Sequence, residues 1–456
     1  MTGQAEAPGR TRHRNRRSVR QWWRSWEWPV VGLAAVIGLV LGYIGFWFYF
    51  GDELAWNRQP WEILYKTIQL LPLQFSWFNK PLHWTLQVAR FLLPTLAVYA
   101  AVKGLAALYV EQLQVLRVRL FARNHTIICG LGQKGLLLAR RLRERGERVV
   151  VIERNEENDL VRAARDVGCV VMLGDATEPY MLNRAGISHA RHLVAVCRDD
   201  GMNAEIAVQA KGLVRQHGGN LHCVCHIFDA RLWALLNEQP PIPDSLGGFR
   251  LEFRNIYKEG AAELLKSDPH FPDPAAEGCP HALVVGVGRM GESLLVELAG
   301  RWRAVRRSDR DRFHITMVDR QALAKHRFLL SEYPQFAGVW CLKPAELDVN
   351  TPQFQEGGFL TDAGAVQRVF VCLDNDSLGL MAALRIQHQL RARSREVAVI
   401  VRTRQQGGLA ALLNSIDDPS CPPHCVKAFG LLDHTCRPEL WLDRDSGPAR
   451  EKGTQT

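Results

Sequence analysis

Three glycines and one glutamate carry the clearest chemistry in this sequence of 456 residues. Gly130, Gly132 and Gly135 are spaced as G-x-G-x-x-G, and Glu153 follows about twenty residues later. Such glycines allow a tight turn, the approach of the backbone to a pyrophosphate, and close packing of a helix on a strand. A carboxylate at this distance accepts hydrogen bonds from ribose hydroxyls. The spacing therefore predicts a site for an adenine nucleotide.

The flanking segments are suited to positioning these residues. Thr126–Cys129 is a short apolar run that predicts a strand, Leu136–Arg145 predicts a helix, and Val149–Ile152 predicts a second strand ending at Glu153. The free N–H groups and the positive dipole end of the helix would face the phosphates. A lone G-x-G-x-x-G is weak evidence, but the strand–turn–helix–strand context strengthens it.

The residues beside the motif bear on the identity of the ligand. Glu153 favours NAD(H) or an adenine nucleotide with an unphosphorylated ribose (ATP, ADP or AMP), while Arg154 beside it leaves NADP open. From its place in the turn, we expect Lys134 at the solvent edge rather than on a phosphate.

Two further loops follow predicted strands. Val170–Leu173 leads into Gly174-Asp175-Ala176-Thr177, and His192–Val196 leads into Asp199 and Asp200. The carboxyl ends of strands are where doubly wound sheets bind ligands, but the same polar residues are good helix N-caps. Ligand contact and capping are compatible, and both stay open. The predicted nucleotide-binding residues are Gly130, Gly132, Gly135, Glu153, Arg154, Asp175, Ala176, Thr177 and Asp200.

Taken together, these motifs resemble the RCK/KTN (TrkA-N) family of regulatory domains on potassium channels and transporters. The resemblance runs from Thr126 to about Leu213 and includes the Leu182-x-x-Ala185-Gly186-Ile187 stretch and the Asp200-x-x-Asn203 helix start. It implies NAD(H) or an adenine nucleotide as a regulatory ligand and assembly into dimers and gating rings, hence a homo-oligomer such as a tetramer. The implied ligand positions are Gly130, Gly132, Gly135, Glu153, Asp175 and Thr177.

A divergent second copy follows. Ala282–Val285 leads into Gly286-x-Gly288-x-x-Gly291, and Val369–Asp376 echoes His192–Asp200. The acid Asp319 comes late because the basic stretch Arg301–Arg312 is inserted before it. Cys341–Pro344 stands near where the Gly-Asp-Ala-Thr loop should be, so we expect no counterpart of that loop. A second Rossmann lobe is predicted, with assembly and ligand binding both open as its role.

The N-terminal region predicts a membrane base. Pro29–Phe50 is uncharged and long enough to cross a bilayer, and Leu86–Val110 is long enough but contains Arg90 and Lys103. Nine of the thirteen Trp fall within the first 84 residues, as in interfacial aromatic belts. Much of the net charge of +10 comes from an arginine-rich arm before the first run. Such an arm sets topology or binds nucleic acid, and its position favours topology.

The segment between the two spans resembles a pore region in layout only. Trp61–Phe75 is too short to cross a membrane, so it is a re-entrant helix or an amphipathic helix on the membrane surface. A potassium filter uses rings of backbone carbonyls from a T-V-G-Y-G-like stretch. Here the chain reads Leu-Pro-Leu-Gln-Phe-Ser without glycine, so familiar potassium selectivity is not supported.

Eleven Cys, several of them in apolar strand-like runs, fit reduced thiols in the cytosol. The groupings Cys223-x-Cys225-His226 and Cys421-x-x-His424-Cys425 lack a matching second pair, so we predict no metal site.

The predicted fold class is a two-span α-helical membrane base followed by two tandem, cytosolic, doubly wound Rossmann-type α/β domains. The predicted segments are a basic arm (1–28), membrane domain (29–110), linker (111–124), first Rossmann domain (125–240), crossover segment (241–280), second Rossmann domain (281–440) and disordered tail (441–456). The chain is predicted to lie in the cell inner (plasma) membrane as a multi-pass protein with both termini cytosolic.

Three functions are compatible with this organisation. The first is a nucleotide-gated, potassium-type channel for a monovalent cation, or a regulatory subunit of ion transport, with no nucleic acid partner. The alternatives are a non-conducting membrane sensor of nucleotides and a membrane-bound NAD-dependent oxidoreductase. Hydride transfer needs an acid–base group beside the substrate, and no residue is predicted as catalytic.

Overall fold

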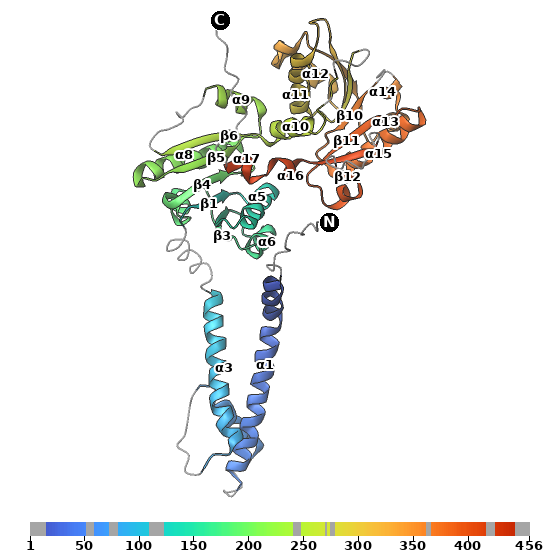
Figure 1. The fold of residues 1–456 in the computed structure, drawn as a ribbon. Coiled ribbons are helices and arrows are strands. Elements are labelled where there is room, and N and C mark those ends of the chain that lie inside the picture. Colours follow the sequence, from blue (N-terminus) through green and yellow to red (C-terminus); the bar gives the residue numbers. More distant parts are fainter. Residues whose placement is uncertain are drawn as a thin grey trace, which may run out of the picture. The chain divides into compact units, whose positions relative to one another are not determined.

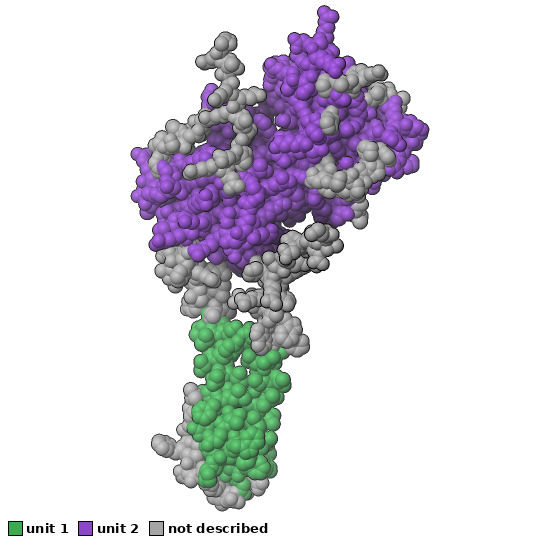
Figure 2. Space-filling view, in the orientation of Figure 1, with its two compact units in different colours: residues 1–113 green, residues 114–456 purple. Residues whose placement is uncertain are grey.

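The computed structural model describes residues 15–51, 59–72, 81–108, 123–239, 248–269, 271–273, 279–361, 366–415 and 425–442. The chain divides into two compact units, Met1–Leu113 and Gln114–Thr456 (Figure 2). The predicted linker falls almost entirely outside the described residues.

The first unit contains two long helices and a short one. They are α1 (Asn15–Tyr49), α2 (Pro60–Ile68) and α3 (Trp84–Leu108). Two segments, Glu27–Tyr49 and Trp84–Leu105, are long and apolar enough to cross a membrane. In the most apolar 18-residue window of each segment, 22% of the residues of the first and 28% of those of the second are buried, so most of both apolar surfaces is exposed in the single chain. The described residues of the predicted basic arm do not form a segment of their own, because they are part of helix α1.

Glycines on α1 let the neighbouring helices approach closely, a common device in membrane helix packing. A Cβ at Gly45 would lie 2.6 Å from Leu86 Cβ on α3, and a Cβ at Gly42 would lie 2.8 Å from Thr67 Cγ2 on α2. The short helix α2 therefore packs on α1 with Ile63 and Thr67 buried.

The second unit begins with a parallel sheet whose strand order is β3-β2-β1-β4-β5-β6, the doubly wound Rossmann arrangement (Figure 1). Its apolar strands are buried on both faces, which explains runs such as Val149–Ile152. The elements are β1 (His125–Cys129), α5 (Gln133–Glu144), β2 (Val149–Glu153), α6 (Leu160–Asp166), β3 (Val170–Leu173), α7 (Pro179–Arg184), η3 (Ile187–His189), β4 (Ala190–Ala195), α8 (Asp200–His217), β5 (Leu221–His226), α9 (Ala230–Glu238) and β6 (Phe249–Arg254).

The second lobe repeats this order in its first five strands, which confirms the predicted repeat. Its parallel sheet runs β9-β8-β7-β10-β11-β13-β12. The elements are α10 (Ile256–Lys266), β7 (His281–Val285), α11 (Arg289–Val305), β8 (Phe313–Asp319), α12 (Ala322–Glu332), η4 (Pro334–Phe336), β9 (Trp340–Glu346), α13 (Pro352–Glu356), α14 (Gly358–Thr361), β10 (Arg368–Val371), α15 (Asp376–Ala392), β11 (Ala398–Thr403), η5 (Gly408–Leu412), β12 (Asn414–Ser415), β13 (Val426–Gly430), α16 (Leu431–Thr435) and α17 (Pro438–Leu442).

Two of the predicted boundaries need correction. The first sheet does not end at residue 240, because β6 pairs with β5 from Phe249 to Arg254 and only the following α10 is helical. The tail does not begin at residue 441, because α17 extends to Leu442 and Trp441 is 1% exposed. The indole N–H of Trp441 donates to the Thr435 carbonyl oxygen at 2.7 Å, which satisfies its only donor in the core.

The two Rossmann lobes share one hydrophobic core. A single cluster of buried side chains includes Leu138 of α5, Ala261 of α10, Leu294 of α11 and Trp441 of α17. A helical layer therefore packs between the two sheets, and the lobes form one compact unit rather than two independent domains.

Candidate functional site

The glycine-rich turn joins β1 to α5. Gly130 has φ +98°, a conformation that other residues rarely adopt, and its N–H donates to the Ile152 carbonyl at 2.9 Å. A Cβ at Gly135 would lie 2.2 Å from the Gly130 carbonyl oxygen. Both glycines are therefore required for the fold of the turn itself, as their spacing predicts.

Gly132 has a different role. Its φ is −84°, and a Cβ built there would meet no atom of the described chain within 4 Å. Gly132 is also the N-cap of α5 and supplies no side-chain cap, so the first N–H groups of the helix keep their capacity to bind an anion. The open space at Gly132 fits a pyrophosphate lying close to the backbone.

Glu153 holds this turn in place from the end of β2. Its Oε2 accepts from the Leu131 N–H at 2.7 Å, and its Oε1 accepts from the Asn155 N–H at 2.9 Å. Asn158 Nδ2 donates to the Leu131 carbonyl oxygen at 2.9 Å, so both polar groups of Leu131 are fixed. Each carboxylate oxygen can accept a second hydrogen bond, which leaves capacity for the two ribose hydroxyls.

The loop after β3 is built around Asp175. Its Oδ1 accepts from the Thr177 N–H at 2.9 Å and from the Thr177 hydroxyl at 2.7 Å, and these donors lower the pKa of Asp175. Arg154 lies 3.5 Å from Asp175 Oδ2, so its guanidinium is already beside a carboxylate. Ala176 is 7% exposed and packs in the core, which leaves only its backbone for contact with a ligand.

Asp200 faces the loop after β5. Its Oδ1 accepts from the Phe228 N–H at 2.7 Å and its Oδ2 from the Asp229 N–H at 3.2 Å. The N-cap of α8 is Asp199, which accepts from the Met202 N–H at 2.9 Å. The structure therefore uses Asp200 to hold the β5–α9 loop, while ligand contact by Asp200 stays a prediction.

Lys134 does not lie at the solvent edge, contrary to the sequence prediction. Its Nζ is buried without a hydrogen-bond partner among the described residues, and it lies 3.9 Å from the centroid of the Phe228 ring. Burial lowers the pKa of Lys134 to about 8. Phe228 was missed at the sequence level, although its position two residues after the end of β5 marks it as part of the ligand-binding edge of the sheet.

The second lobe carries the same framework. Asp319 Oδ2 accepts from the Val287 N–H at 2.8 Å, as Glu153 does from Leu131. A Cβ at Gly291 would lie 2.2 Å from the Gly286 carbonyl oxygen, the distance found at Gly135. Asp376 accepts from the N–H of Arg404, a residue 28 positions later, just as Asp200 accepts from Phe228.

The Gly-Asp-Ala-Thr loop does have a structural counterpart, which corrects the sequence prediction. The Asn350 N–H donates to Asp348 Oδ1 at 2.9 Å, and the Leu347 N–H donates to the Asp319 carbonyl as Gly174 does to Glu153. Two differences between the lobes explain why this loop could not be identified from the sequence. Strand β9 has seven residues where β3 has four, so Cys341–Pro344 falls within the strand, and only the aspartate is retained in the loop.

The charges around the second turn differ from those of the first. Lys325 Nζ lies 2.7 Å from Asp319 Oδ2, so the acid that would receive a ribose is already paired. A Cβ at Gly288 would lie 3.9 Å from Asp374 Oδ2, which places a carboxylate beside the turn where phosphates would approach. This arrangement opposes nucleotide binding in the second lobe.

The described residues also bear on metal and thiol chemistry. Within those ranges no group of three or more His, Cys, Asp or Glu residues could hold a metal ion. Burial raises the pKa of the Cys197 thiol, which lies against the glycine turn, to about 11. Cys421 and His424 lie outside the described residues.

Comparison with known proteins supports the assignment of the first lobe. Residues 126–224 match the TrkA-N domain. Potassium channel protein 1 of Methanocaldococcus jannaschii is 32% identical over 90 residues, and the voltage-gated potassium channel Kch of Escherichia coli is 29% identical over 93 residues. Each match covers 20% of this chain and only 27% and 22% of the respective relative.

The crystal structure of GsuK bound to ADP is similar over 93% of this chain and 98% of that chain, with 15% identity and a TM-score of 0.45. This TM-score is too low to support conclusions about ligand or assembly.

Proposed function

We propose that this chain, whose residues 126–224 form a TrkA-N domain, is a nucleotide-regulated membrane protein that conducts a monovalent cation such as potassium or controls its conduction. The observation that carries the proposal is the turn at the start of α5, where Glu153 fixes Leu131 and the space at Gly132 is open. The ligand is NAD(H) or an adenine nucleotide. The relatives whose names describe potassium channels support the cation.

Each group at the turn has a role in recognition. The N-terminal N–H groups of α5 bind the phosphates, and Glu153 accepts hydrogen bonds from the ribose hydroxyls. Asp175 and Thr177 border the site from the next strand end. Arg154 is occupied by Asp175, which favours an unphosphorylated ribose over a 2′-phosphate.

Helix α5 links this site to the second lobe. Its N-terminus forms the phosphate turn, and near its other end Arg141 donates to the carbonyl oxygens of Asp433 and Cys436 at 2.9 and 3.0 Å. Arg145 pairs with Glu439 on α17. A ligand that binds more tightly to one placement of α5 therefore shifts α16 and α17 as well, which is the differential affinity that a switch requires.

The order of helices in the membrane base supports ion conduction, whereas the sequence after α2 argues against it. Two long helices with a short helix between them correspond to a two-span pore domain with both termini cytosolic, which would assemble as a tetramer. The stretch after α2 reads Leu-Pro-Leu-Gln-Phe-Ser, and the absence of glycine from it favours a second candidate, a non-conducting membrane sensor of nucleotides. Residues 73–80 lie outside the described part of the structure.

Replacement of Gly132 by alanine separates ligand binding from folding. The Cβ has free space in the protein but occupies the position of the pyrophosphate, so Gly132→Ala should weaken ADP and NAD binding about 100-fold or more, a change of roughly 3 kcal/mol, with little change in the unfolding temperature. The matched control is Gly288→Ala in the second lobe, which should leave affinity unchanged. Isothermal titration of the full-length protein in detergent measures both. Unchanged affinity in Gly132→Ala would show that the site is misplaced.

Single-channel recording distinguishes the two candidate functions. Full-length protein in a planar bilayer should carry a monovalent-cation current whose open probability changes when NAD, ADP or ATP is added on the cytosolic side. The Glu153→Ala variant should conduct without this response. A silent bilayer formed from protein that still binds nucleotide would support the sensor, and turnover of bound NADH with a substrate would support the oxidoreductase.

A further inference from the structure

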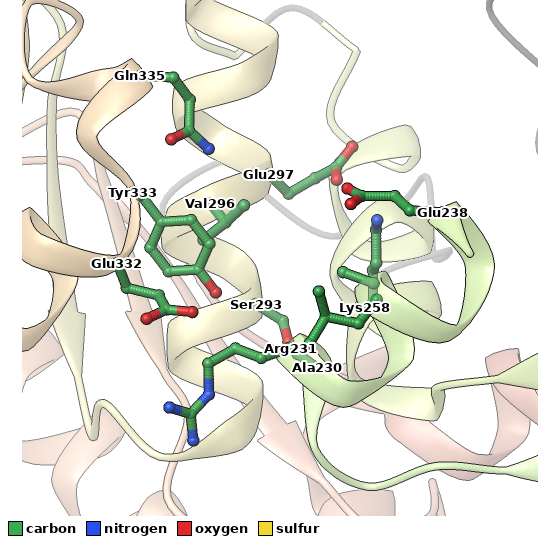
Figure 3. Close-up of a pocket in the computed structure, with 12 residues that line it drawn as sticks. Ala230, Arg231, Glu238, Lys258, Ser293, Val296, Glu297, Glu332, Tyr333 and Gln335 are labelled. Atoms are coloured by element: carbon green, nitrogen blue, oxygen red, sulfur yellow. The ribbon is translucent and has the colours of Figure 1, made fainter. Parts of the chain in front are cut away.

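A cavity of about 290 Å³ lies among α9, α10, α11 and the end of α12 (Figure 3), and none of its lining residues belongs to the glycine turn. Its walls come from both Rossmann lobes, because α9 belongs to the first lobe and α11 and α12 to the second. The volume is close to the lower end of the range for sites that bind small molecules.

One end of the cavity carries two carboxylates and one ammonium group. Glu238 of α9 and Glu297 of α11 extend toward the same region (Figure 3). Across the described ranges neither carboxylate forms an ion pair or a side-chain hydrogen bond. Lys258 lines the same end and acts electrostatically on both carboxylates, but its ammonium lies 4.0 Å from the Trp233 ring centroid and forms no ion pair with either of them. Two carboxylates thus share one cation.

At the other end of the cavity, a carboxylate again lies near a cation that other groups also engage. Glu332 lines it next to Tyr333, and its carboxylate has no ion-pair partner in the residues that the structure describes. The cation at this end, Arg231, is already bonded to Asp229 at 3.1 Å and stacks over the Phe328 ring at 5.0 Å. At each end the carboxylates outnumber the cation, because Glu238 and Glu297 share Lys258, and Arg231 serves Asp229 as well as Glu332.

Apolar side chains and one unpartnered hydroxyl also line the cavity. The apolar residues are Ala234, Leu235 and Val296. Ser293 also lines it, is only 7% exposed, and its Oγ has no hydrogen-bond partner within the described part of the chain. A buried hydroxyl without a partner is costly, and a donor from a bound ligand would satisfy it.

We propose that this cavity binds a linear polyamine. Its terminal ammonium groups bind Glu238 and Glu297 at one end and Glu332 at the other, and its methylene chain lies along Ala234 and Val296. Where the ligand has an amino group within its chain, that group donates to Ser293 Oγ. Because the walls come from two lobes, the polyamine ties α9 to α11 and so favours one placement of the lobes. This site is independent of the proposed nucleotide site.

Isothermal titration of the full-length protein in detergent tests the proposal. The probes are α,ω-diaminoalkanes of increasing chain length, with the matching monoamines and Mg²⁺ alone for comparison. We expect diamines to bind with an optimum at one chain length and monoamines to bind at least about tenfold more weakly, since each lost ammonium–carboxylate contact contributes on the order of a factor of ten.

The variant Glu238→Gln/Glu297→Gln removes the charge at one end without changing its shape and should weaken diamine binding about 100-fold. Glu332→Gln, an exposed position that tolerates substitution, should weaken it about tenfold, and Glu356→Gln on α13 is the matched control with no effect. ADP affinity should be unchanged in all three, which separates this site from the nucleotide site. The proposal is overturned by an absence of diamine binding, by equal binding of monoamines, by charge-sensitive binding of Mg²⁺ in place of diamines, or by wild-type diamine affinity in the double variant.

Discussion

At the scale of single residues, Lys134 shows how the surroundings override an expectation from sequence. A lysine in a phosphate-binding turn is expected to face water or phosphate, but its Nζ lies 3.9 Å from the centroid of the Phe228 ring. The same ring lies 5.2 Å from the guanidinium of Arg289, the first residue of α11 in the second lobe. Cations from the two glycine turns therefore share one aromatic ring, which Asp200 holds by its backbone.

Replacing Lys134 by methionine, the residue at the matching position 290 of the second turn, should stabilise the protein. Burial lowers the pKa of Lys134 from 10.5 to about 8, so near pH 7 the folded state holds an ammonium that the unfolded state hydrates better. We expect a gain of about 1–3 kcal/mol near pH 7, part of the full shift being offset by the Phe228 ring.

The downward shift of the Lys134 pKa also determines how the stability of the protein depends on pH. Between about pH 8 and pH 10.5 the unfolded chain binds more protons than the folded chain at Lys134, so wild-type stability should rise with pH in that window. Lys134→Met should remove this rise, and Arg140→Met on the exposed face of α5 should not. Thermal unfolding of the full-length protein in detergent at several pH values measures both, and a destabilised Lys134→Met would contradict the assigned burial.

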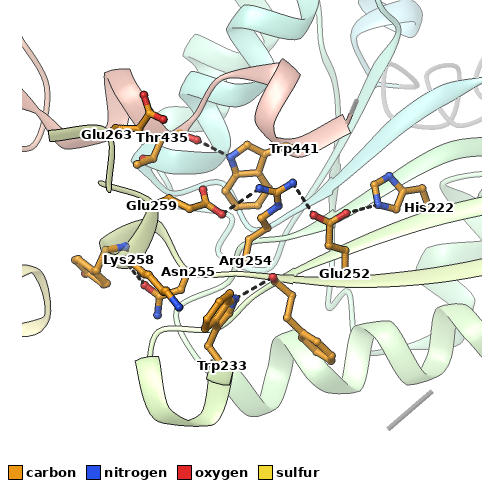
Figure 4. A network of polar contacts seen from close by, with 12 residues as sticks. His222, Trp233, Glu252, Arg254, Asn255, Lys258, Glu259, Glu263, Thr435 and Trp441 are labelled. Carbon is orange, nitrogen blue, oxygen red and sulfur yellow. Dashed lines mark hydrogen bonds and ion pairs between the residues drawn. The ribbon is translucent and has the colours of Figure 1, made fainter. Parts of the chain in front are cut away.

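At the scale of elements, β6 and α10 connect the two lobes through a buried ionic network (Figure 4). Arg254 is 5% exposed and lies 2.5 Å from Glu252 and 3.3 Å from Glu259 of α10, while His222 of β5 bonds to Glu252 at 3.1 Å. One guanidinium thus serves two carboxylates. Burial raises the pKa of Glu259 to about 7 in spite of this pairing.

Glu259→Gln should therefore stabilise the fold at high pH. Between about pH 4.5 and pH 7 the folded state binds more protons at Glu259 than the unfolded state, so wild-type stability falls as pH rises through that window. The glutamine variant should lose this fall and gain about 1–2 kcal/mol near pH 8, with Arg254 still paired to Glu252. Melting temperatures measured from pH 5 to pH 8 test this. A Glu144→Gln control at an exposed position of α5 should keep the wild-type slope.

At the scale of the whole molecule, the unit Gln114–Thr456 is not a pair of separable domains. The core cluster that contains Leu138 and Leu142 of α5 continues through Leu264 of α10 to Trp302 and Trp441 of the second lobe. Cutting the chain at the predicted boundary near residue 240 would also remove β6 from the first sheet. The apolar helical layer would then face water on one side.

A fragment of residues 114–239 should accordingly be aggregation-prone and readily digested, whereas residues 114–442 should be compact and protease-resistant. The reason is that burial of the α5 face stabilises the folded state by about 25 cal/mol per Å² of apolar area, and the short fragment lacks this stabilisation. Size-exclusion chromatography with limited proteolysis compares the two. Cooperative unfolding and full ADP affinity in the short fragment would show that the lobes are independent.

The chain by itself determined much of this architecture. The apolar runs of the strands, the glycine spacing and the acids Glu153 and Asp319 identified both Rossmann lobes, since a buried parallel strand and a tight turn each demand specific residue types. Local pattern also indicated the two long apolar helices, because their length and lack of charge are properties of sequence.

Tertiary structure decided what depends on partners distant in the chain. Lys134 and Phe228 meet only because β5 ends beside the glycine turn, and Asp348 takes the place of Asp175 only once the longer β9 is aligned with β3. The pairing of Lys325 with Asp319, which separates the second turn from the first, likewise required the fold. Local sequence sets backbone conformation and burial pattern, whereas the charge and packing of a site are set by groups that only the folded chain brings together.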